Sequence, residues 1–228
     1  MGNKAAVFGS TGLIGSHLIK ILEADPDFNL VIAPTRKNAS YSNKKIKNIV
    51  IDFKNFKSYV DVVEGCDSVF IAIGTTQSKV KWDKKKYIEI DYGIPINIAR
   101  ACELCKVNKI VLVTSAGANI NEKNFYISLK GKIEKDIMNY NIDNIYIMRP
   151  SLLLGERKEK RFGEKIAQVV MPLFSSVIPK IYRPIHANDV AQSMIDISKN
   201  PINSCKIYHY EEMMDSNNLW TYIQQVTA

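Results

Sequence analysis

The sequence predicts an α/β protein with a doubly wound, mainly parallel sheet, helices on both faces and a small C-terminal cap. Three observations support this: apolar β-branched segments alternate with helical ones, a glycine-rich turn follows the first of them, and 228 residues suffice for one domain. Uninterrupted apolar strands indicate a parallel sheet that is covered on both faces. Right-handed crossovers between such strands give the doubly wound arrangement.

The first part of the chain sets up the alternation. Residues 4–8 are a short apolar run that ends at a glycine, which predicts a strand. Residues 13–24 place isoleucines and leucines at helical spacing on one face, which predicts an amphipathic helix. Three further apolar runs predict strands at residues 30–33, 46–51 and 68–73.

The alternation continues through the middle of the chain. Residues 87–107 have the pattern of a long helix, and we expect a kink near Pro95 because proline cannot donate the helical hydrogen bond. Residues 109–114 and 144–148 are β-branched runs and predict two more strands. The helical segment 126–140 lies between them.

After Pro150 the alternation loosens. Helices are predicted at residues 161–176, 188–199 and 216–226, and a short strand at residues 206–208. These pieces are too small for a second domain. We therefore expect residues 1–228 to form one domain, in which residues 151–228 cap the substrate side of the sheet.

The charge balance favours an anionic ligand. The chain has 31 basic and 23 acidic residues, for a net charge of +8. A phosphorylated cofactor and a nucleic acid would both suit this charge. The basic residues are scattered and no zinc-finger, RRM or KH signature is present, so no nucleic-acid partner is predicted.

The cysteines and the apolar segments indicate where the protein acts. The four cysteines follow no secretory signal, so a reducing compartment is expected and a cytoplasmic location is predicted. Cys102 and Cys105 have no second pair with which to bind zinc, so no metal is predicted. The longest apolar stretch, residues 166–182, is interrupted by prolines and a lysine, so no membrane partner is predicted.

A glycine-rich turn joins the first strand to the first helix. Gly9 permits the tight turn, Gly12 lets a pyrophosphate approach the backbone, and Gly15 lets the helix pack closely on the sheet. The amides at the helix start would then face the phosphates. This context predicts a Rossmann-like, NAD(P)-binding domain. Its phosphate-binding residues are expected to be Gly9, Ser10, Thr11, Gly12, Leu13, Ile14 and Gly15.

The end of the second strand indicates which dinucleotide is bound. An NAD-specific site places a carboxylate there for the ribose hydroxyls, but this chain has Arg36 and Lys37. Both cations would attract a 2′-phosphate. We therefore expect NADP(H) to be preferred over NAD(H).

Two YxxxK motifs are candidates for catalysis. Tyr126 and Lys130 lie four residues apart in a predicted helix and therefore share one face. Ser115 ends the preceding strand and can lie beside the Tyr126 phenol. The second motif, Tyr41 with Lys45, lies in a polar stretch that we interpret as a loop away from the carboxyl end of the central strands.

These features together resemble the atypical short-chain dehydrogenase/reductase superfamily. Within it the chain is similar to the small Tat-interacting-protein-type NADP(H)-binding oxidoreductases. The superfamily resemblance rests on residues 9–15, 73–76, 115, 126, 130, 149–151 and 185–191. The similarity to the smaller group rests on residues 74–76, 126–131, 134 and 149–156.

The resemblance implies a role for each matched residue. Ser115 would orient the substrate oxygen, Tyr126 would be the general acid/base, and Lys130 would bind the ribose and tune Tyr126. Many extended members have asparagine where this chain has Asp91, so the proton relay departs from their pattern; the alternative interpretation of Asp91 is an ion pair with a nearby lysine. Further cofactor contacts are implied for Ala72, Ile73, Gly74 and Thr75 at the riboses and for Pro150, Ser151 and Leu152 at the nicotinamide.

The predicted function is NADPH-dependent reduction of a small carbonyl substrate, or oxidation of the alcohol. Two alternatives stay open: a non-catalytic NADP(H)-binding regulator that presents a surface to a protein, and a nucleotide-sugar epimerase or dehydratase. Whether the chain forms a homodimer also stays open. Substrate specificity is expected to depend on residues 155–182, since the fold itself does not determine the substrate.

Overall fold

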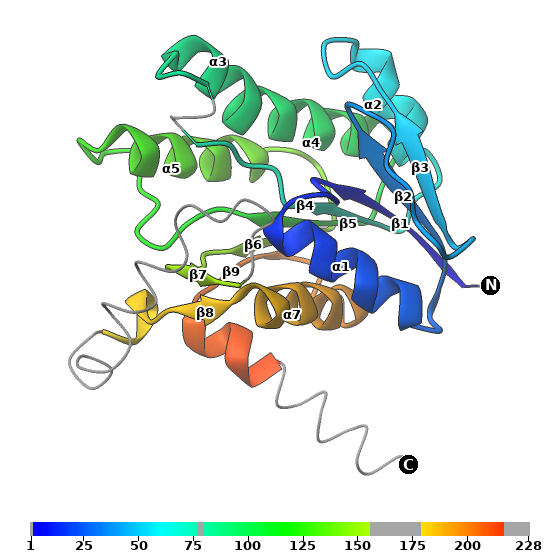
Figure 1. Ribbon diagram of the computed structural model, residues 1–228. Helices are drawn as coiled ribbons and strands as arrows, with labels where there is room; N and C mark the ends of the chain where they lie inside the picture. The colour runs from blue at the N-terminus through cyan, green and yellow to red at the C-terminus, as the bar shows by residue number, and fades with distance from the viewer. Residues whose placement is uncertain (1, 77–79, 156–178, 217–228) are drawn as a thin grey trace.

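The computed structural model describes residues 2–76, 80–155 and 179–216, and its centre is a seven-stranded parallel sheet (Figure 1). The strand order is β3-β2-β1-β4-β5-β6-β9, which confirms the predicted doubly wound topology. The strands are β1 (Asn3–Phe8), β2 (Phe28–Thr35), β3 (Ile46–Val50), β4 (Ser68–Ile71), β5 (Lys109–Val113), β6 (Asn144–Met148) and β9 (Cys205–Tyr208).

The central strands form because their side chains are apolar on both sides. All four residues of β4 and all five of β6 are buried. Strand β1 lies between β2 and β4, with Ala5 opposite Val31 on one side and Ser68 on the other. The order of the strands therefore reverses beside β1, which is where open α/β sheets bind ligands.

Helices cover both faces of this sheet (Figure 1). One face carries α1 (Leu13–Ala24) and α7 (Ala187–Lys199), which pack against each other. The other face carries α2 (Phe56–Val63), α4 (Ile94–Leu104) and α5 (Phe125–Ile137). Each layer encloses its own apolar core against the sheet. Helix α2 was not predicted, because its eight residues carry too short a pattern to stand out.

The long helix predicted over residues 87–107 differs in its bounds and its interior. It begins with α3 (Lys84–Ile88), where the Asp83 side chain caps the amide of Lys86. A π-helical turn, η1 (Glu89–Gly93), then leads into α4, which ends at Leu104. Pro95 lacks the amide hydrogen that a regular helix would use there, which is consistent with the wider turn just before it.

Most of the residues that the structure describes after Pro150 belong to the main layers, so within this described part the cap is smaller than the one predicted for residues 151–228. Helix α7 belongs to the layer that also contains α1, and β9 extends the main sheet beside β6. Only the short pair β7 (Leu153–Leu154) and β8 (Ile185–His186), with the 3₁₀ turn η2 (Lys180–Tyr182), follows the carboxyl end of β6. The predicted helix at residues 161–176 lies outside the described residues. Most of the helix predicted at residues 216–226 lies outside them too, and the described residues 210–216 are helical.

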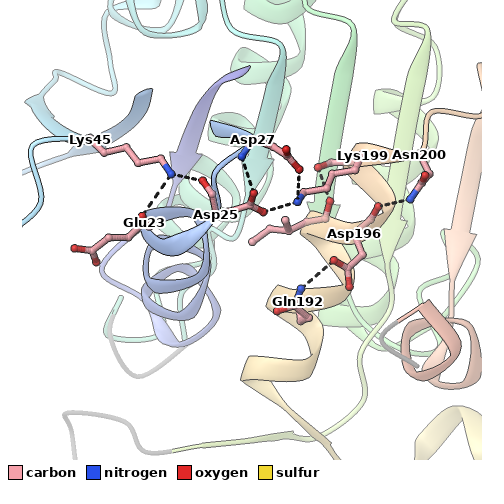
Figure 2. A network of polar contacts seen from close by, with 10 residues as sticks. Glu23, Asp25, Asp27, Lys45, Gln192, Asp196, Lys199 and Asn200 are labelled. Carbon is pink, nitrogen blue, oxygen red and sulfur yellow. Dashed lines mark hydrogen bonds and ion pairs between the residues drawn. The ribbon is translucent and has the colours of Figure 1, made fainter. Parts of the chain in front are cut away.

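A polar network closes the opposite, amino-terminal end of the sheet (Figure 2). The Lys199 ammonium contacts Asp25 at 2.6 Å and Asp27 at 2.7 Å, and so joins the end of α7 to the segment between α1 and β2. Lys45 donates to the backbone carbonyls of Glu23 and Asp25.

No helix within the described ranges is long and apolar enough to cross a membrane.

Candidate cofactor and active site

The glycine turn and the end of β4 meet at the carboxyl edge of the sheet. Gly9 follows β1 with φ +89°, a conformation that only glycine adopts without strain. A Cβ atom at Gly9 would lie 2.5 Å from the Ala72 carbonyl oxygen, so a side chain is also excluded sterically. The predicted tight turn at Gly9 is therefore present, and it brings the residues after β1 against those after β4.

The turn closes on itself before α1 begins. The Gly12 amide donates to the Gly9 carbonyl at 2.8 Å. Gly12 is the N-cap residue and, as a glycine, offers no side chain to the amides of the first helical turn. A Cβ at Gly15 would lie 2.0 Å from the Gly9 carbonyl oxygen, so Gly15 allows the helix to approach the turn that directly follows β1. The first helical amides thus face the space where an anion would bind.

The Tyr41 loop was wrongly predicted to lie away from this edge. Its hydroxyl donates to the Ser10 Oγ atom at 3.0 Å, and Ser10 is only 2% exposed. Residues 41–45 are not helical, and Lys45 points to the network at the other end of the sheet. Tyr41 and Lys45 therefore do not form a catalytic pair, but Tyr41 steadies the glycine turn. This contact could not be predicted from residue spacing, because it depends on how the loop between β2 and β3 folds back.

Arg36 and Lys37 follow β2 and are exposed. The turn that carries them is held in place: the Thr35 hydroxyl donates to the Lys37 carbonyl at 2.7 Å, and the Asn48 side chain donates to Thr35 Oγ1 at 2.8 Å. The two cations thus extend from an anchored turn on the strand next to the glycine turn.

Tyr126 and Lys130 lie on one face of α5, as predicted. The Asn124 side chain caps the start of this helix through the amides of Tyr126 and Ile127. The Lys130 Nζ atom lies 5.7 Å from the centre of the Tyr126 ring. Gly131 allows α5 to pack closely on the preceding loop, since a Cβ there would lie 2.3 Å from the Ile120 amide nitrogen.

Lys130 forms a buried ion pair with Asp91 from η1. The two charged atoms are 3.0 Å apart, and the side chains are 6% and 1% exposed. The other Asp91 oxygen accepts the Thr75 amide at 2.8 Å. Asp91 therefore connects the segment Ala72, Ile73, Gly74 and Thr75 to helix α5. The sequence indicated Asp91 as a departure from the asparagine of related proteins and, alternatively, as the partner of a nearby lysine, and the ion pair confirms the second interpretation.

Ser115 and the residues after β6 lie on neighbouring strands. Ser115 follows β5 and is half-buried, with its hydroxyl near the Ala116 carbonyl at 3.3 Å. The Ala116 amide donates to the Pro150 carbonyl at 2.9 Å, which holds the two strand ends together. Ser151 donates to the Arg183 carbonyl, and the Leu152 carbonyl accepts the Ile185 amide.

A buried ion pair fixes the strand ends beneath Ser115. Glu134 of α5 accepts hydrogen bonds from Arg149 and, at 2.6 Å, from the Thr114 hydroxyl. Glu134 is 3% exposed. Because both oxygens have charged or hydroxyl donors, this carboxylate ties α5 to β5 and β6 and positions Ser115 relative to Tyr126.

Tyr87 is a neighbour of the site that the sequence did not reveal. It is 3% exposed and its ring contacts Phe125 edge-on at 5.7 Å between centroids. Its hydroxyl donates to the Thr75 carbonyl at 3.4 Å. Burial raises the pKa of Tyr87, and the negative charge of Asp91 raises it further. Tyr87 therefore stays neutral at physiological pH.

Comparison with known proteins assigns the family. Residues 9–201 match the family model described as NAD(P)H-binding. The chain belongs to this NAD(P)H-binding family. Its resemblance to the atypical short-chain dehydrogenase/reductases is thereby confirmed, and NAD(P) binding is the function that it shares with its family.

Relatives and solved structures agree with this family assignment. The chain is 31% identical over 203 residues to "Protein FMP52, mitochondrial" from Candida albicans, covering 86% of this chain and 88% of that protein. MoeE5 in complex with UDP-glucuronic acid and NAD shares the fold, with a TM-score of 0.70, 16% identity and coverage of 90% and 75%. The oxidoreductase ylbE from Lactococcus lactis has a TM-score of 0.66, 16% identity and coverage of 93% and 95%.

The predicted cytoplasmic location is wrong. The Candida albicans relative of this NAD(P)H-binding protein is named as mitochondrial. The prediction rested on free cysteines, and these fit any reducing compartment. Cysteine chemistry could therefore not distinguish a mitochondrial from a cytoplasmic protein.

Proposed function

We propose that this chain is an NADPH-dependent reductase of a small carbonyl substrate, with Tyr126 as the general acid. The observation that supports it best is the common location of the glycine turn and the Tyr126–Lys130 pair. Both lie at the carboxyl edge of the sheet, and the segment Ala72 to Thr75 lies between them. Ala72 approaches Gly9 of the turn, and the Thr75 amide donates to Asp91, which pairs with Lys130. A dinucleotide laid along this edge would reach from one to the other.

The residues at the edge fit such a cofactor. Gly9 and Gly15 leave no room for side chains at the turn, and the first amides of α1 have no side-chain cap at Gly12. These amides would hold the pyrophosphate. Arg36 and Lys37 would hold a 2′-phosphate, which favours NADP(H) over NAD(H). Pro150, Ser151 and Leu152 would border the nicotinamide.

The reduced cofactor, when bound, supplies hydride to the substrate carbon. Ser115 would donate a hydrogen bond to the substrate oxygen and fix its position. Tyr126 would give its phenolic proton to the same oxygen as negative charge develops there. Lys130 has three N–H donors, of which one is directed to Asp91, so two could bind ribose hydroxyls.

Consumption of NADPH with a panel of small aldehydes and ketones tests this function. We expect turnover with at least one carbonyl, and loss of it in Tyr126→Phe with NADPH affinity retained. Tight NADPH binding without any turnover would contradict the reductase function and support a regulatory protein that only binds the cofactor.

A nucleotide sugar is the second candidate substrate. It is favoured by the structural similarity to MoeE5, which was solved with UDP-glucuronic acid and NAD. The chain covers 75% of that protein, so part of that protein has no equivalent here. Including UDP-sugars in the same panel tests this candidate, which requires conversion of the sugar with the cofactor regenerated.

A further inference from the structure

Two buried polar atoms without a hydrogen-bond partner lie at the carboxyl edge of the sheet. Among the residues that the structure describes, four buried side-chain nitrogen or oxygen atoms have no such partner. Two of them belong to Ser68, the first residue of β4, and to Asp196 of α7. The other two are Arg183 Nε, in the turn before β8, and His209 Nδ1, directly after β9. A buried polar atom without a partner costs free energy, which a ligand that binds it recovers.

Arg183 belongs to a segment that contacts two parts of the proposed active site. Its backbone carbonyl accepts a hydrogen bond from the Ser151 hydroxyl, and Ser151 is proposed to border the nicotinamide. The preceding residue, Tyr182, lies against the loop that follows Ser115, since a Cβ atom at Gly117 would be 3.7 Å from its hydroxyl oxygen. Arg183 is therefore placed beside the proposed positions of the nicotinamide and of the substrate.

The charge of Arg183 is not balanced by a carboxylate of the described chain. None of the ion pairs between described residues includes Arg183, and its Nε atom has no acceptor there. Two neighbouring cations differ in this respect. Lys180, on the same segment, pairs with Glu211, and Arg149, just after β6, pairs with Glu134. Arg183 is thus a cation of this edge that is available to an anionic ligand.

The chemistry of the guanidinium group specifies the kind of ligand. Its five N–H groups form a rigid fork that fits two oxygens of a carboxylate or of a phosphate. Arg183 is partly buried, so solvent and salt screen its charge less than that of an exposed cation. An oxygen-bearing anion would therefore bind here more strongly than a neutral group of the same size.

We propose that Arg183 binds an anionic group of the substrate, which makes the substrate a carbonyl compound that also has a carboxylate or a phosphate. Ser115 and Tyr126 hold the carbonyl oxygen of this compound, and Arg183 holds its anionic group. The anionic group takes no part in the reaction. Because the compound is held at two places, its carbonyl carbon is oriented for hydride transfer. This inference rests on the proposed function.

The missing partner also distinguishes ligand binding from a structural role. Arg183→Met keeps a long side chain but removes the charge and the buried N–H group. The change leaves no carboxylate of the described chain without its cation, because Arg183 pairs with none. We therefore expect Arg183→Met to unfold at the same temperature as the wild-type protein or slightly higher. A clearly lower midpoint of thermal unfolding would assign Arg183 a structural role and contradict the proposal.

The activity test uses carbonyl compounds in matched pairs with NADPH. Pyruvate is compared with pyruvamide to test a carboxylate, and glyceraldehyde 3-phosphate with glyceraldehyde to test a phosphate. We expect one anionic compound to be preferred, and Arg183→Met to lower its kcat/KM about 10- to 100-fold, chiefly through KM. The neutral member of that pair should be unaffected. Lys180→Met, which removes a cation from the same segment, is the control and should keep the preference. Equal losses for both members of a pair, or no loss, overturn the proposal.

A binding test needs no turnover. Thermal unfolding is measured in excess NADPH, which keeps other anions from the glycine turn and from Arg36, with phosphate, acetate or chloride at equal ionic strength. Relative to chloride, we expect phosphate or acetate to raise the midpoint of the wild-type protein by about 2 °C or more and to leave that of Arg183→Met unchanged. The same response in both proteins overturns the proposal. A protein that shows this difference but reduces no carbonyl would contradict the proposed function and leave the anion site of Arg183 standing.

Discussion

Two buried lysines lie at opposite ends of the sheet, and they differ in what surrounds them. Lys130 lies within α5 near the carboxyl edge, with one carboxylate, Asp91, and the ring of Tyr126 beside it. Lys199 ends α7 at the amino-terminal end and contacts two carboxylates, Asp25 and Asp27 (Figure 2). Both side chains are largely shielded from water, at 6% and 12% exposed.

A buried lysine–aspartate pair does not by itself mark an active site. Lys199 has an architectural reason to be charged: it lies at the C-terminus of a helix, where the dipole favours a cation, and it joins α7 to the start of β2. Burial lowers the pKa of Lys199, but the hydrogen bonds that its ammonium donates to Asp25 and Asp27 more than offset this and leave the pKa raised. Lys130 gains no such help from a helix end, and it faces groups that could bind a cofactor.

The largest expected effect lies at the carboxyl edge. Tyr126→Phe removes the proposed proton donor but keeps the ring, so kcat/KM with NADPH and a carbonyl should fall about 10²- to 10⁴-fold. Tyr140→Phe, three residues beyond the end of the same helix, is the control and should retain activity. Equal losses in both variants would show that the phenol of Tyr126 has no special role.

The glycine turn offers the next test. Gly15→Ala places a Cβ 2.0 Å from the Gly9 carbonyl oxygen, and the turn must move to accept it. We expect the free energy of unfolding to fall by about 2 to 3 kcal/mol and NADPH binding to weaken, as measured by denaturant unfolding and titration. In the control Gly93→Ala the nearest atom is the Ile88 carbonyl oxygen at 3.8 Å, and no loss is expected.

At the other end of the sheet the effect should be on stability alone. Lys199→Met leaves Asp25 without its cation, so the free energy of unfolding should fall by about 2 kcal/mol while kcat/KM stays unchanged. Lys57→Met, which breaks an exposed pair with Asp61, is the control and should not change the unfolding measurably. A large loss of activity in Lys199→Met would contradict the division between the two ends.

The smallest effect concerns Asp196 of α7. Burial raises its pKa to about 6, above that of an unfolded aspartate at about 4, and its Oδ2 atom has no hydrogen-bond partner among the described residues. The folded state thus binds more protons between these values. The stability that this group contributes is fully present below pH of about 4 and is lost as the pH rises through about 6.

It follows that Asp196→Asn should stabilise the protein at neutral pH by about 1 kcal/mol, because the buried charge is removed. The gain should fade as the pH falls toward 4, where the wild-type carboxyl is itself protonated. Thermal unfolding of both proteins across this pH range measures the effect. A gain that does not depend on pH would contradict the assignment of the titration to Asp196.

The sequence predicted the fold well because strand and helix patterns are local. All seven predicted strands, the glycine turn and the helical face shared by Tyr126 and Lys130 follow from apolar periodicity and residue spacing. The sequence did not predict that α7 packs beside α1 or that β9 joins the main sheet. A helix or a strand has the same apolar pattern whether it belongs to a cap or to the main layers. Which edge of the sheet an added strand joins is decided by long-range packing.

The contacts of the candidate site were harder to predict than its residues. Tyr41 reaches Ser10 through a loop, and Tyr87 reaches the Thr75 carbonyl from a helix that starts earlier than expected. Asp91 pairs with a lysine 39 positions further along the chain. A single sequence carries no signal for such pairs, because each depends on two elements that come together only when the sheet is assembled.

The most direct test of the central claim is calorimetric titration of the protein with NADPH and with NADH, repeated with Arg36→Ala. We expect NADPH to bind the wild-type protein more tightly than NADH does. We expect Arg36→Ala to weaken NADPH binding about tenfold or more, while NADH binding changes little. If neither nucleotide binds the wild-type protein, the assignment of the carboxyl edge as a dinucleotide site is contradicted.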